Sequence, residues 1–440
     1  ALEARLAAAE QRAQQRTAQP ASAQRRAPPA PGSSAAVATK AEKPAPGSAT
    51  TVQQAASAEP AAPGSIDAPP PRQGGYRAVG SGTAFNPQLS VILDGNYYHD
   101  DIDGAGAGLA GNAFQPSTAG LEHGHEEDGH GHGETDNGFN FREAEIAFSA
   151  TVDPYFDATT YVSIDGDGNV DLEEAYFQTR SLPHGLKLKG GKFLSDFGYI
   201  NRQHPHQWDF VDQNLPYLNL LGEHGLQDTG VQLTWLPDWP VYTLLGLELL
   251  QGDQERFGTT LGGDTQAALG LDDTRDGPRL WTAFAKLAPD LGYDHALQFG
   301  LSYARNDQHQ EAHEELEEHA PGDEHETDAI LTGLEGDADL WGLDLVYKYD
   351  GVGDRGHRDF KLQAEYLRVI KDTRVSSGDA DLLGSALKFT TDGLYVQGTY
   401  GVWPRWNLGL RYDVLGLTNK ARGADDRDFG SSDRWSVGLT

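Results

Sequence analysis

The sequence predicts an all-β transmembrane fold, an antiparallel β-barrel of the outer-membrane type, on three observations. Apolar residues occur in short runs that alternate with polar residues, as in strands with one apolar and one polar face. The connections between these runs are mostly short and long in turn, and no run approaches the roughly 18 apolar residues of a membrane-spanning helix. The 440 residues include 53 glycines, 9% aromatic residues and no cysteine, which excludes disulfides and thiolate metal sites.

The clearest unit is a hairpin at Gln227–Gly252. In its first arm Val231, Leu233 and Trp235 share one face, and the residues between them are polar. Two prolines within Leu236–Pro240 exclude a helix and turn the chain. The same unit recurs to the C-terminus, so the pattern predicts fourteen strands. They are residues 87–98, 138–151, 156–165, 171–181, 185–195, 227–236, 240–251, 279–288, 293–305, 339–349, 358–370, 390–401, 405–416 and 433–440.

The lengths of the connections predict which rim of the barrel each belongs to. Short connections leave the even-numbered strands, at Val152–Tyr155, Leu182–His184, Pro237–Trp239, Ala288–Gly292, Asp350–His357 and Val402–Pro404. Long ones leave the odd-numbered strands, at His99–Asn137, Gly198–Leu226, Gly252–Pro278, Asn306–Ala338, Lys371–Phe389 and Leu417–Ser432, and Gly166–Val170 is the exception. In outer-membrane barrels short turns face the periplasm and long loops the exterior. Trp235, Trp239, Trp403 and Trp406 flank short turns, so we expect them at one lipid interface.

Two later strands show which residues face inward. Trp341, Leu343 and Leu345 share a face that Asp344 opposes, and residues 406–414 alternate in the same way. A large apolar outside and a polar inside predict a water-filled lumen rather than a packed core. The candidate lumen residues are Arg142, Glu143, Glu145, Glu174, Arg180, Lys187, Lys189, Asp344, Lys361, Glu365 and Arg411. Charges of both signs across a pore would set its selectivity.

The N-terminal part has a different composition. Residues 1–19 are rich in helix formers, and Leu2, Leu6, Ala9 and Ala13 follow a heptad spacing, which fits either an oligomerising coiled coil or a solvated terminal helix. Residues 20–82 hold 11 of the 23 prolines and predict a disordered linker. The barrel is expected over residues 83–440. No signal peptide is visible, so an exported protein would be represented by its mature form.

The net charge of -32 lies in the predicted barrel. Residues 1–82 carry 9 Lys and Arg against 5 Asp and Glu, and the remainder carries 25 against 61. Nucleic acid is therefore not an expected partner. Cations, or a lipopolysaccharide surface bridged by divalent ions, are expected instead.

The residues at 139–198 resemble a known family. The segments FNFREAEIAFSATVDPYFDATTYVSID, DLEEAYFQT and LKLKGGKFLSDFG are similar to the early strands of phosphate-selective-type outer-membrane porins. Among these they are most similar to a histidine-rich branch described as zinc-regulated outer-membrane proteins. The resemblance covers residues 85–440, and it implies about two strands more than the fourteen visible. Such barrels close with a strand that ends in an aromatic residue, whereas this sequence stops at Thr440.

Histidines gather in the long connections. Twelve of the fifteen lie there: His99, His123, His125, His130, His132, His204, His206, His224, His309, His313, His319 and His325. Two clusters interleave imidazoles with carboxylates, ligands that suit Zn²⁺, Ni²⁺ or Cu²⁺. The metal candidates are His123, His125, His130, His132, His309, His313, His319 and His325. We expect His309 and His313 to share a helical face with Glu317, and the alternative for both clusters is a solvated polar loop.

One further pattern resembles a metal site, and no pattern resembles a catalytic one. Asp165–Glu173 is similar to the start of a calcium-binding EF-hand loop, but Val170 stands where that loop needs glycine, so an acidic hairpin turn is the stronger interpretation. No Ser/His/Asp grouping, glycine-rich phosphate loop or spaced carboxylate pair stands out, so we expect no enzyme and no required cofactor.

These observations favour a bacterial outer-membrane porin that passes small polar solutes or ions by diffusion. Its outer loops would capture zinc or a similar ion, and its N-terminal arm would lie in the periplasm. The alternative is a structural barrel that tethers the outer membrane to the cell wall. Expected partners are outer-membrane lipid, lipopolysaccharide, peptidoglycan through the arm, and two further copies in a homotrimer.

Overall fold

The computed structural model describes residues 87–99, 137–316, 329–378, 383–423 and 426–440, with the backbone alone for 313–316 and 329–330. The chain divides into two compact units, Ala1–Arg77 and Ala78–Thr440. The predicted helix at 1–19 and linker at 20–82 lie outside the described residues. Everything below concerns the second unit.

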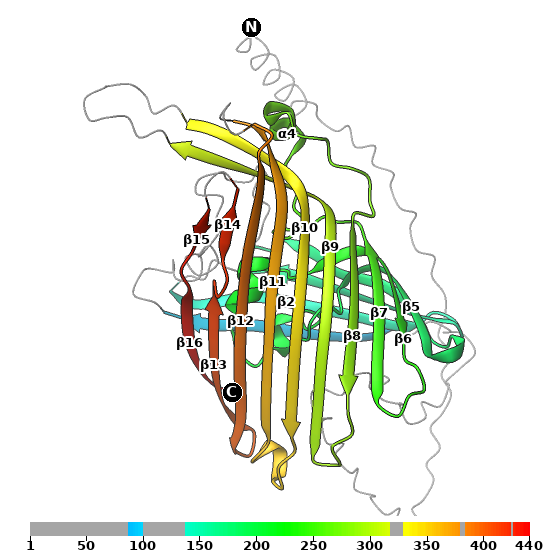
Figure 1. Ribbon diagram of the computed structural model, residues 1–440. Coiled ribbons are helices and arrows are strands. Elements are labelled where there is room, and N and C mark those ends of the chain that lie inside the picture. The colour runs from blue at the N-terminus through cyan, green and yellow to red at the C-terminus, as the bar shows by residue number, and fades with distance from the viewer. Residues whose placement is uncertain (1–86, 100–136, 317–328, 379–382, 424–425) are drawn as a thin grey trace, which may run out of the picture. The chain divides into compact units, whose positions relative to one another are not determined.

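The second unit is one antiparallel sheet of sixteen strands (Figure 1). The strands are β1 (Gln88–Tyr98), β2 (Gly138–Thr151), β3 (Phe156–Asp165), β4 (Val170–Thr179), β5 (Leu186–Leu194), β6 (Gln227–Trp235), β7 (Tyr242–Leu250), β8 (Leu280–Ala288), β9 (His295–Leu316), β10 (Ala329–Tyr349), β11 (Phe360–Ser377), β12 (Ala386–Trp403), β13 (Trp406–Leu415), β14 (Lys420–Arg422), β15 (Arg427–Asp428) and β16 (Ser432–Leu439). The helical elements are η1 (Pro183–Gly185), η2 (Pro205–Gln207), α3 (Leu215–Leu220), α4 (Gly263–Leu269) and η3 (Asp354–Gly356). Within the described residues, no helix has the length and apolar character needed to cross a membrane.

All fourteen predicted strands are confirmed, with ends that differ by a few residues in most cases. The two additional strands, β14 and β15, are short and pair with each other beside β12. The largest difference is at β9 and β10, which run for 22 and 21 residues and pair far beyond the predicted ends (Figure 1). The expected helix through His309 and His313 is therefore wrong, because both residues lie on β9.

Each long strand pairs with its neighbours in sequence, from β1 to β13 and then β16. In such a meander successive connections alternate between the two rims, so the predicted sorting of short turns and long connections is confirmed. The turns beside Trp235 and Trp403 share the short-turn rim, opposite the rim at which β1 ends and β2 begins. The β3–β4 connection is an acidic hairpin turn, which confirms the interpretation favoured for Asp165–Glu173. There one carboxylate oxygen of Asp165 accepts the amide protons of Asp167 and Asn169.

The two faces of the sheet have reversed polarity compared with a soluble protein. On β6 and β7 the apolar Val231, Leu233 and Leu247 are exposed, whereas Gln232 and Glu248 are buried. The outward apolar run on β10 extends from Trp341 to Tyr349, a length that matches the 9–11 residues of a transmembrane strand.

Aromatic side chains end this apolar band on both sides. Trp281, Tyr303 and Trp341 pack together, with centroids 5.1 and 4.5 Å apart, and the next outward residue on β10 is the charged Asp339. Toward the short turns, Trp235 packs edge-on against Trp239. Aromatic girdles of this kind border the apolar band of membrane barrels.

The inner face is not the water-filled lumen that the sequence predicts, at least between β5 and β12. A buried apolar cluster lies there, formed by residues 193–226 with inward side chains such as Leu280, Leu340, Leu367 and Tyr395. The prediction was wrong because it treated every long connection as external, whereas the β5–β6 connection packs against the inner face of the sheet.

Candidate functional site

The site is organised by residues 195–226, which join β5 to β6 and are called here the interior segment. The sequence places most of this stretch outside the barrel as a long loop. In the structure it contains η2 and α3, and Asn214 caps α3 by accepting the amide proton of Tyr217 at 3.0 Å. The segment bonds to strands far away in sequence, so its position is set by tertiary contacts.

Glu365 on β11 holds the first part of the segment. Its carboxylate accepts the amide protons of Tyr199 and Ile200 at 2.7 and 3.0 Å. It also accepts the hydroxyl proton of Tyr217 at 2.8 Å, and that of Tyr395. Gly198 precedes this contact with a φ of 62°, and a Cβ there would lie 2.5 Å from the Glu365 carboxylate. Only glycine therefore lets the backbone approach so closely.

Glu248 on β7 holds the start of the segment. It accepts the amide proton of Asp196 at 3.1 Å and the hydroxyl proton of Ser195. Burial alone would raise the pKa of Asp196, but the cations of Lys189, Lys286 and Arg202 outweigh burial and hold this pKa below its usual range.

The later part of the segment is held by basic residues of the last strands. Lys361 on β11 donates to Asp209 at 2.7 Å, and Arg411 on β13 donates to Asp212 at 2.6 Å. Phe210 lies between Asp209 and Asp212 in the sequence and packs against Gly409. A Cβ at Gly409 would lie 3.0 Å from the ring of Phe210. Glycine on β13 thus leaves the space that the ring fills.

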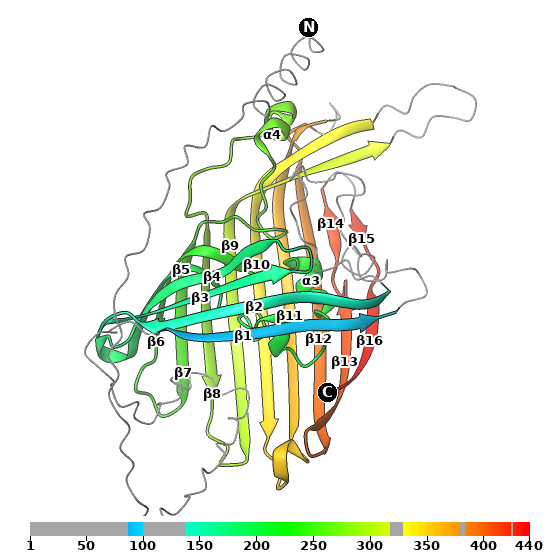
Figure 2. The same cartoon turned by 180° about the vertical axis from the view of Figure 1, so that it is seen from behind.

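Both ends of the sheet reach the same part of the segment. Arg142 on β2 donates to the carbonyl of Val211 at 3.0 Å, and Arg434 on β16 donates to the carbonyl of Gln213 at 2.9 Å. Strands near both ends of the sheet, β2 and β16, therefore contact the same segment. Figure 2 shows β1 and β2 running across the direction of β10–β13. In the described part of the chain, no backbone pairing joins β1 to β16.

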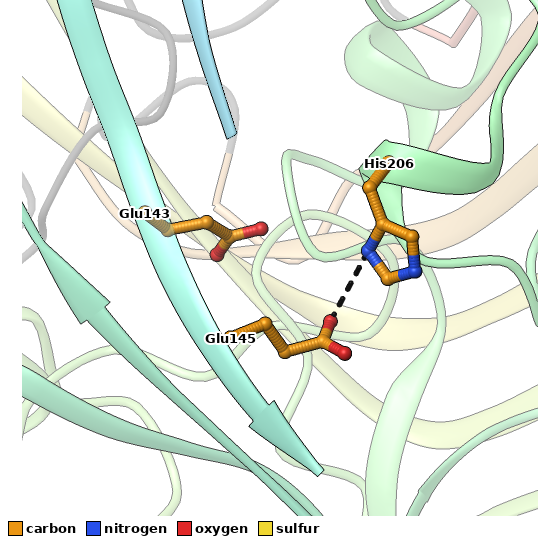
Figure 3. A group of neighbouring side chains, drawn as sticks. All are labelled: Glu143, Glu145 and His206. Carbon is orange, nitrogen blue, oxygen red and sulfur yellow. Dashed lines mark ion pairs between the residues drawn. The ribbon is translucent and has the colours of Figure 1, made fainter. Parts of the chain in front are cut away.

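A buried cluster of glutamates and histidines lies where the segment meets β2 and β4. His204 Nδ1 lies 3.2 Å from Glu145 Oε2 and 2.9 Å from Glu173 Oε2, and its Nε2 lies 2.8 Å from Glu174 Oε1. His206 Nδ1 lies 3.3 Å from the same oxygen of Glu145 (Figure 3). Burial alone would lower the pKa of His204, but the surrounding carboxylates of Glu145, Glu173 and Glu174 raise this pKa to about 12.

Two β-bulges supply the charges of this region. The register between β1 and β2 pairs Asp94 with Glu143 and Gly95 with Phe141, so Arg142 is an extra residue. The register between β3 and β4 similarly passes over Glu173. A bulge re-aims the side chains on either side of it. This is how the consecutive Glu173 and Glu174 both reach His204.

A cavity of about 440 Å³ adjoins the cluster. Its lining includes Glu143, Glu173 and His204 from the cluster, and Arg142 and Arg434 from the two ends of the sheet. Solvent and small ions therefore have space beside the carboxylates.

Most of the predicted lumen residues contact the interior segment or its surroundings. Glu145, Glu174, Lys361, Glu365 and Arg411 bond to it as described, Arg142 bonds to Val211, and Lys189 lies 3.9 Å from Asp196. Glu143 is buried beside Glu145, and Asp344 accepts a hydrogen bond from the side-chain amide of Gln298 at 3.2 Å. Arg180 and Lys187 are exposed near the short-turn rim, and Arg180 lies 3.5 Å from Asp157.

The predicted metal ligands are described only in part. His123, His125, His130, His132, His319 and His325 lie outside the described residues, and for His313 the backbone alone is described. His309 is buried, with Nε2 at 2.8 Å from Glu311. Whether these histidines bind metal stays a prediction.

Sequence reasoning missed Glu173, His204 and His206 as a group. Their signal was present but weak: Arg142-Glu143 and Glu173-Glu174 are charged pairs inside strands that should alternate, which indicates a bulge. Nothing local indicates that His204 turns inward.

The fold and the site together define a class. The chain is an all-β transmembrane protein of the outer-membrane β-barrel type, with an inward-folded segment that narrows its interior. No family model matches the sequence.

Comparison with known proteins finds one relative at substantial identity and several distant structures. An uncharacterized protein of Aquifex aeolicus (strain VF5) is 36% identical over 335 residues, 76% of this chain and 65% of that protein. The chain thus spans less than two thirds of this relative's length. OmpT, an outer membrane protein of Vibrio cholerae, solved in a trimer form, is 14% identical over 70% of this chain and 77% of its own, with a TM-score of 0.37. An anion-selective porin from Comamonas acidovorans is 12% identical over 69% and 91%, with a TM-score of 0.30.

Proposed function

We propose that the protein is an outer-membrane channel that passes small polar solutes or ions by diffusion. The observation that supports this most is the set of charged side chains of both signs that anchor the interior segment and line the cavity beside it. A barrel needed only as an anchor could fill its interior with apolar side chains. Here buried Glu248, Glu365 and Arg411 instead position a segment that leaves a cavity beside it.

The charges around the cavity would select among ions. Glu143 and Glu173 line it together with Arg142, and Arg434, which lies 3.1 Å from Asp212, lines it as well. Opposed charges across a narrow passage focus the field and favour one sign of ion. Glu143 and Glu173 come from β2 and β4, and Arg434 comes from β16.

Single-channel recording in planar bilayers tests this proposal. The full chain should give discrete conductance steps, and exchanging the bath ions should give a non-zero reversal potential. Substituting Arg434→Gln should shift that potential toward cations, whereas the exposed Arg180→Gln should leave it unchanged. A folded, inserted protein that never conducts would contradict the channel.

We further propose that the two histidine-rich connections capture zinc outside the channel. Protonated imidazole cannot bind a metal, so affinity should fall as pH drops through about 6.5. Calorimetry at pH 7.5 and 5.5 compares the wild type with a variant carrying alanine at all eight histidines predicted from the sequence. Equal zinc uptake by both proteins would end this part of the proposal and leave the channel standing.

A further inference from the structure

We propose that Glu145, Glu173, His204 and His206, with Glu143 beside them, form a binding site for a first-row divalent transition-metal ion inside the barrel. This site is separate from the histidine-rich connections and does not depend on conduction. Figure 3 shows the carboxylates of Glu143 and Glu145 near the ring of His206. Imidazole nitrogen together with carboxylate oxygen suits ions such as Zn²⁺ better than Ca²⁺ or Mg²⁺, which prefer oxygen alone.

The ligand atoms are already close enough to share one ion. Those of Glu143, Glu145 and His206 lie within 4.8 Å of one another, as do those of Glu145, Glu173 and His204. In the described part of the chain these are the two such groups that contain histidine. Zinc bonds of about 2.1 Å in a tetrahedron place neighbouring ligand atoms about 3.4 Å apart. The observed separations of 2.9–3.3 Å need to widen only slightly.

The same atoms lack hydrogen bonds although they are buried. Glu145 is 1% exposed, and neither of its carboxylate oxygens has a hydrogen bond; Glu173 Oε2 and His206 Nδ1 also have none. An unsatisfied buried carboxylate is costly in free energy. Atoms that converge without donor–acceptor geometry are what a central cation would hold.

Glu174 is a positioning residue for this site. One of its oxygens lies 2.8 Å from His204 Nε2, and the other accepts the amide proton of Leu194 at 3.0 Å. A carboxylate on the far nitrogen of a metal-bound histidine fixes the ring and its tautomer. Here it would hold the ring proton on Nε2, so that the ion would displace the proton of Nδ1. Tyr161 packs against the same ring, with centroids 4.5 Å apart.

The competing interpretation is a purely structural ion pair between His204 and its carboxylates. Such a pair accounts for the contacts of Glu145, Glu173 and Glu174 with His204. It does not account for the second imidazole, His206, which lies 3.3 Å from the same oxygen of Glu145 without a hydrogen bond, or for Glu143 beside them. The cavity at Glu143 and Glu173 gives an ion a way in.

Metal binding by the full-length protein in detergent tests the proposal. The background carries alanine at His123, His125, His130, His132, His313, His319 and His325, which removes ligands outside the cluster and keeps the buried His309. After treatment with a chelator, Co²⁺ titration should give visible absorption bands that saturate at one ion per chain, and Zn²⁺ should abolish them. Glu145→Gln should weaken Zn²⁺ binding at least tenfold. Glu174→Gln should weaken it roughly 10- to 100-fold while the bands persist at high Co²⁺.

The matched control is His184→Ala with His357→Ala, which removes two histidines near the short turns and should leave binding unchanged. Heat-modifiable migration in electrophoresis reports whether each variant is folded. If Glu145→Gln does not fold, the Co²⁺ titration of the background protein decides alone. Absence of saturable bands, or equal Zn²⁺ binding by background and a folded Glu145→Gln, overturns the site. Neither result affects conductance, so the proposed channel would fail or stand separately.

Discussion

At the scale of single residues, Glu365 shows what sequence can and cannot supply. Its inward facing follows from the alternation of β11, and it was predicted as a lumen residue. Its partners Tyr199, Ile200 and Tyr217 lie 148–166 positions earlier, and no local pattern links them to it. The donors arrive because a long connection turns inward, and period-two alternation carries no information about that.

Glu365→Gln should loosen the interior segment without unfolding the sheet. The change keeps the shape but replaces one of the two accepting oxygens with an amide nitrogen that cannot accept, and each buried donor left unsatisfied costs about 1–3 kcal/mol. Hydrogen exchange at Tyr199 and Ile200 should therefore accelerate about tenfold or more. Glu335→Gln is the control: it alters contacts to Asp272 and Ser376 and should leave residues 195–226 unchanged. Unchanged exchange in Glu365→Gln would contradict the anchoring role.

Acid should loosen the start of the same segment. The pKa of Asp196 is depressed by Lys189, Lys286 and Arg202, so its stabilising effect is present above the ordinary carboxyl pKa of about 3.9. It is lost as pH falls from there through the folded-state pKa. Amide exchange of residues 195–203, corrected for its intrinsic pH dependence, should rise below about pH 4. Asp196→Asn should make this exchange fast already at pH 7. Slow, pH-independent amide exchange in Asp196→Asn would contradict the stabilising role of Asp196.

At the scale of elements, the strands could be predicted within the apolar band, and their extensions beyond it could not. A strand that contacts lipid on one side and polar groups on the other must alternate, so β10 was visible from Trp341 to Tyr349. Beyond Asp339 its outward side is charged, and Arg305 lies 2.9 Å from Asp337 and 3.1 Å from Asp339. The alternation then disappears although the strand continues. The same loss concealed the extension of β9, where Gln310 bonds to Gln266 and Asp272.

Replacing residues 199–221 with a short Gly/Ser linker should widen the channel. The replacement removes α3 and the cluster members Ile200, Tyr217, Leu220 and Leu221 from the interior, while β5 and β6 keep their pairing. Single-channel conductance should rise roughly twofold or more, because the open cross-section sets it. A linker variant with wild-type conductance would show that ions pass elsewhere.

At the scale of the whole molecule, the depth of the apolar band is a measurable quantity. Leu345 lies at the middle of the outward run on β10, and Tyr349 at its end. Arginine on the lipid face costs about 2–4 kcal/mol at the bilayer midplane and about 0–1 near an interface. Leu345→Arg should therefore lower the free energy of unfolding in lipid vesicles far more than Tyr349→Arg. Equal effects in urea titrations would contradict the assigned band.

Homotrimer formation is a second property of the whole molecule that can be measured. The heptad spacing of Leu2 and Leu6 predicts a homotrimer, which mass measurement in mild detergent tests. Deleting residues 1–19 should reduce the mass to that of one chain if the helix supplies the contact. A monomer with the helix intact would contradict the trimer.

The interior segment also fixes an order of events during assembly. It precedes β6 in the chain, yet its bonds to β11, β13 and β16 join residues up to 221 positions apart. Contacts so remote in sequence form late, because the intervening chain must first be closed into place. The residues that narrow the barrel therefore wait for Arg434 on β16, which is synthesised after all the other strands of the described sheet. The passage is at its widest while the barrel is still being built, and completing the wall is what reduces it to its working width.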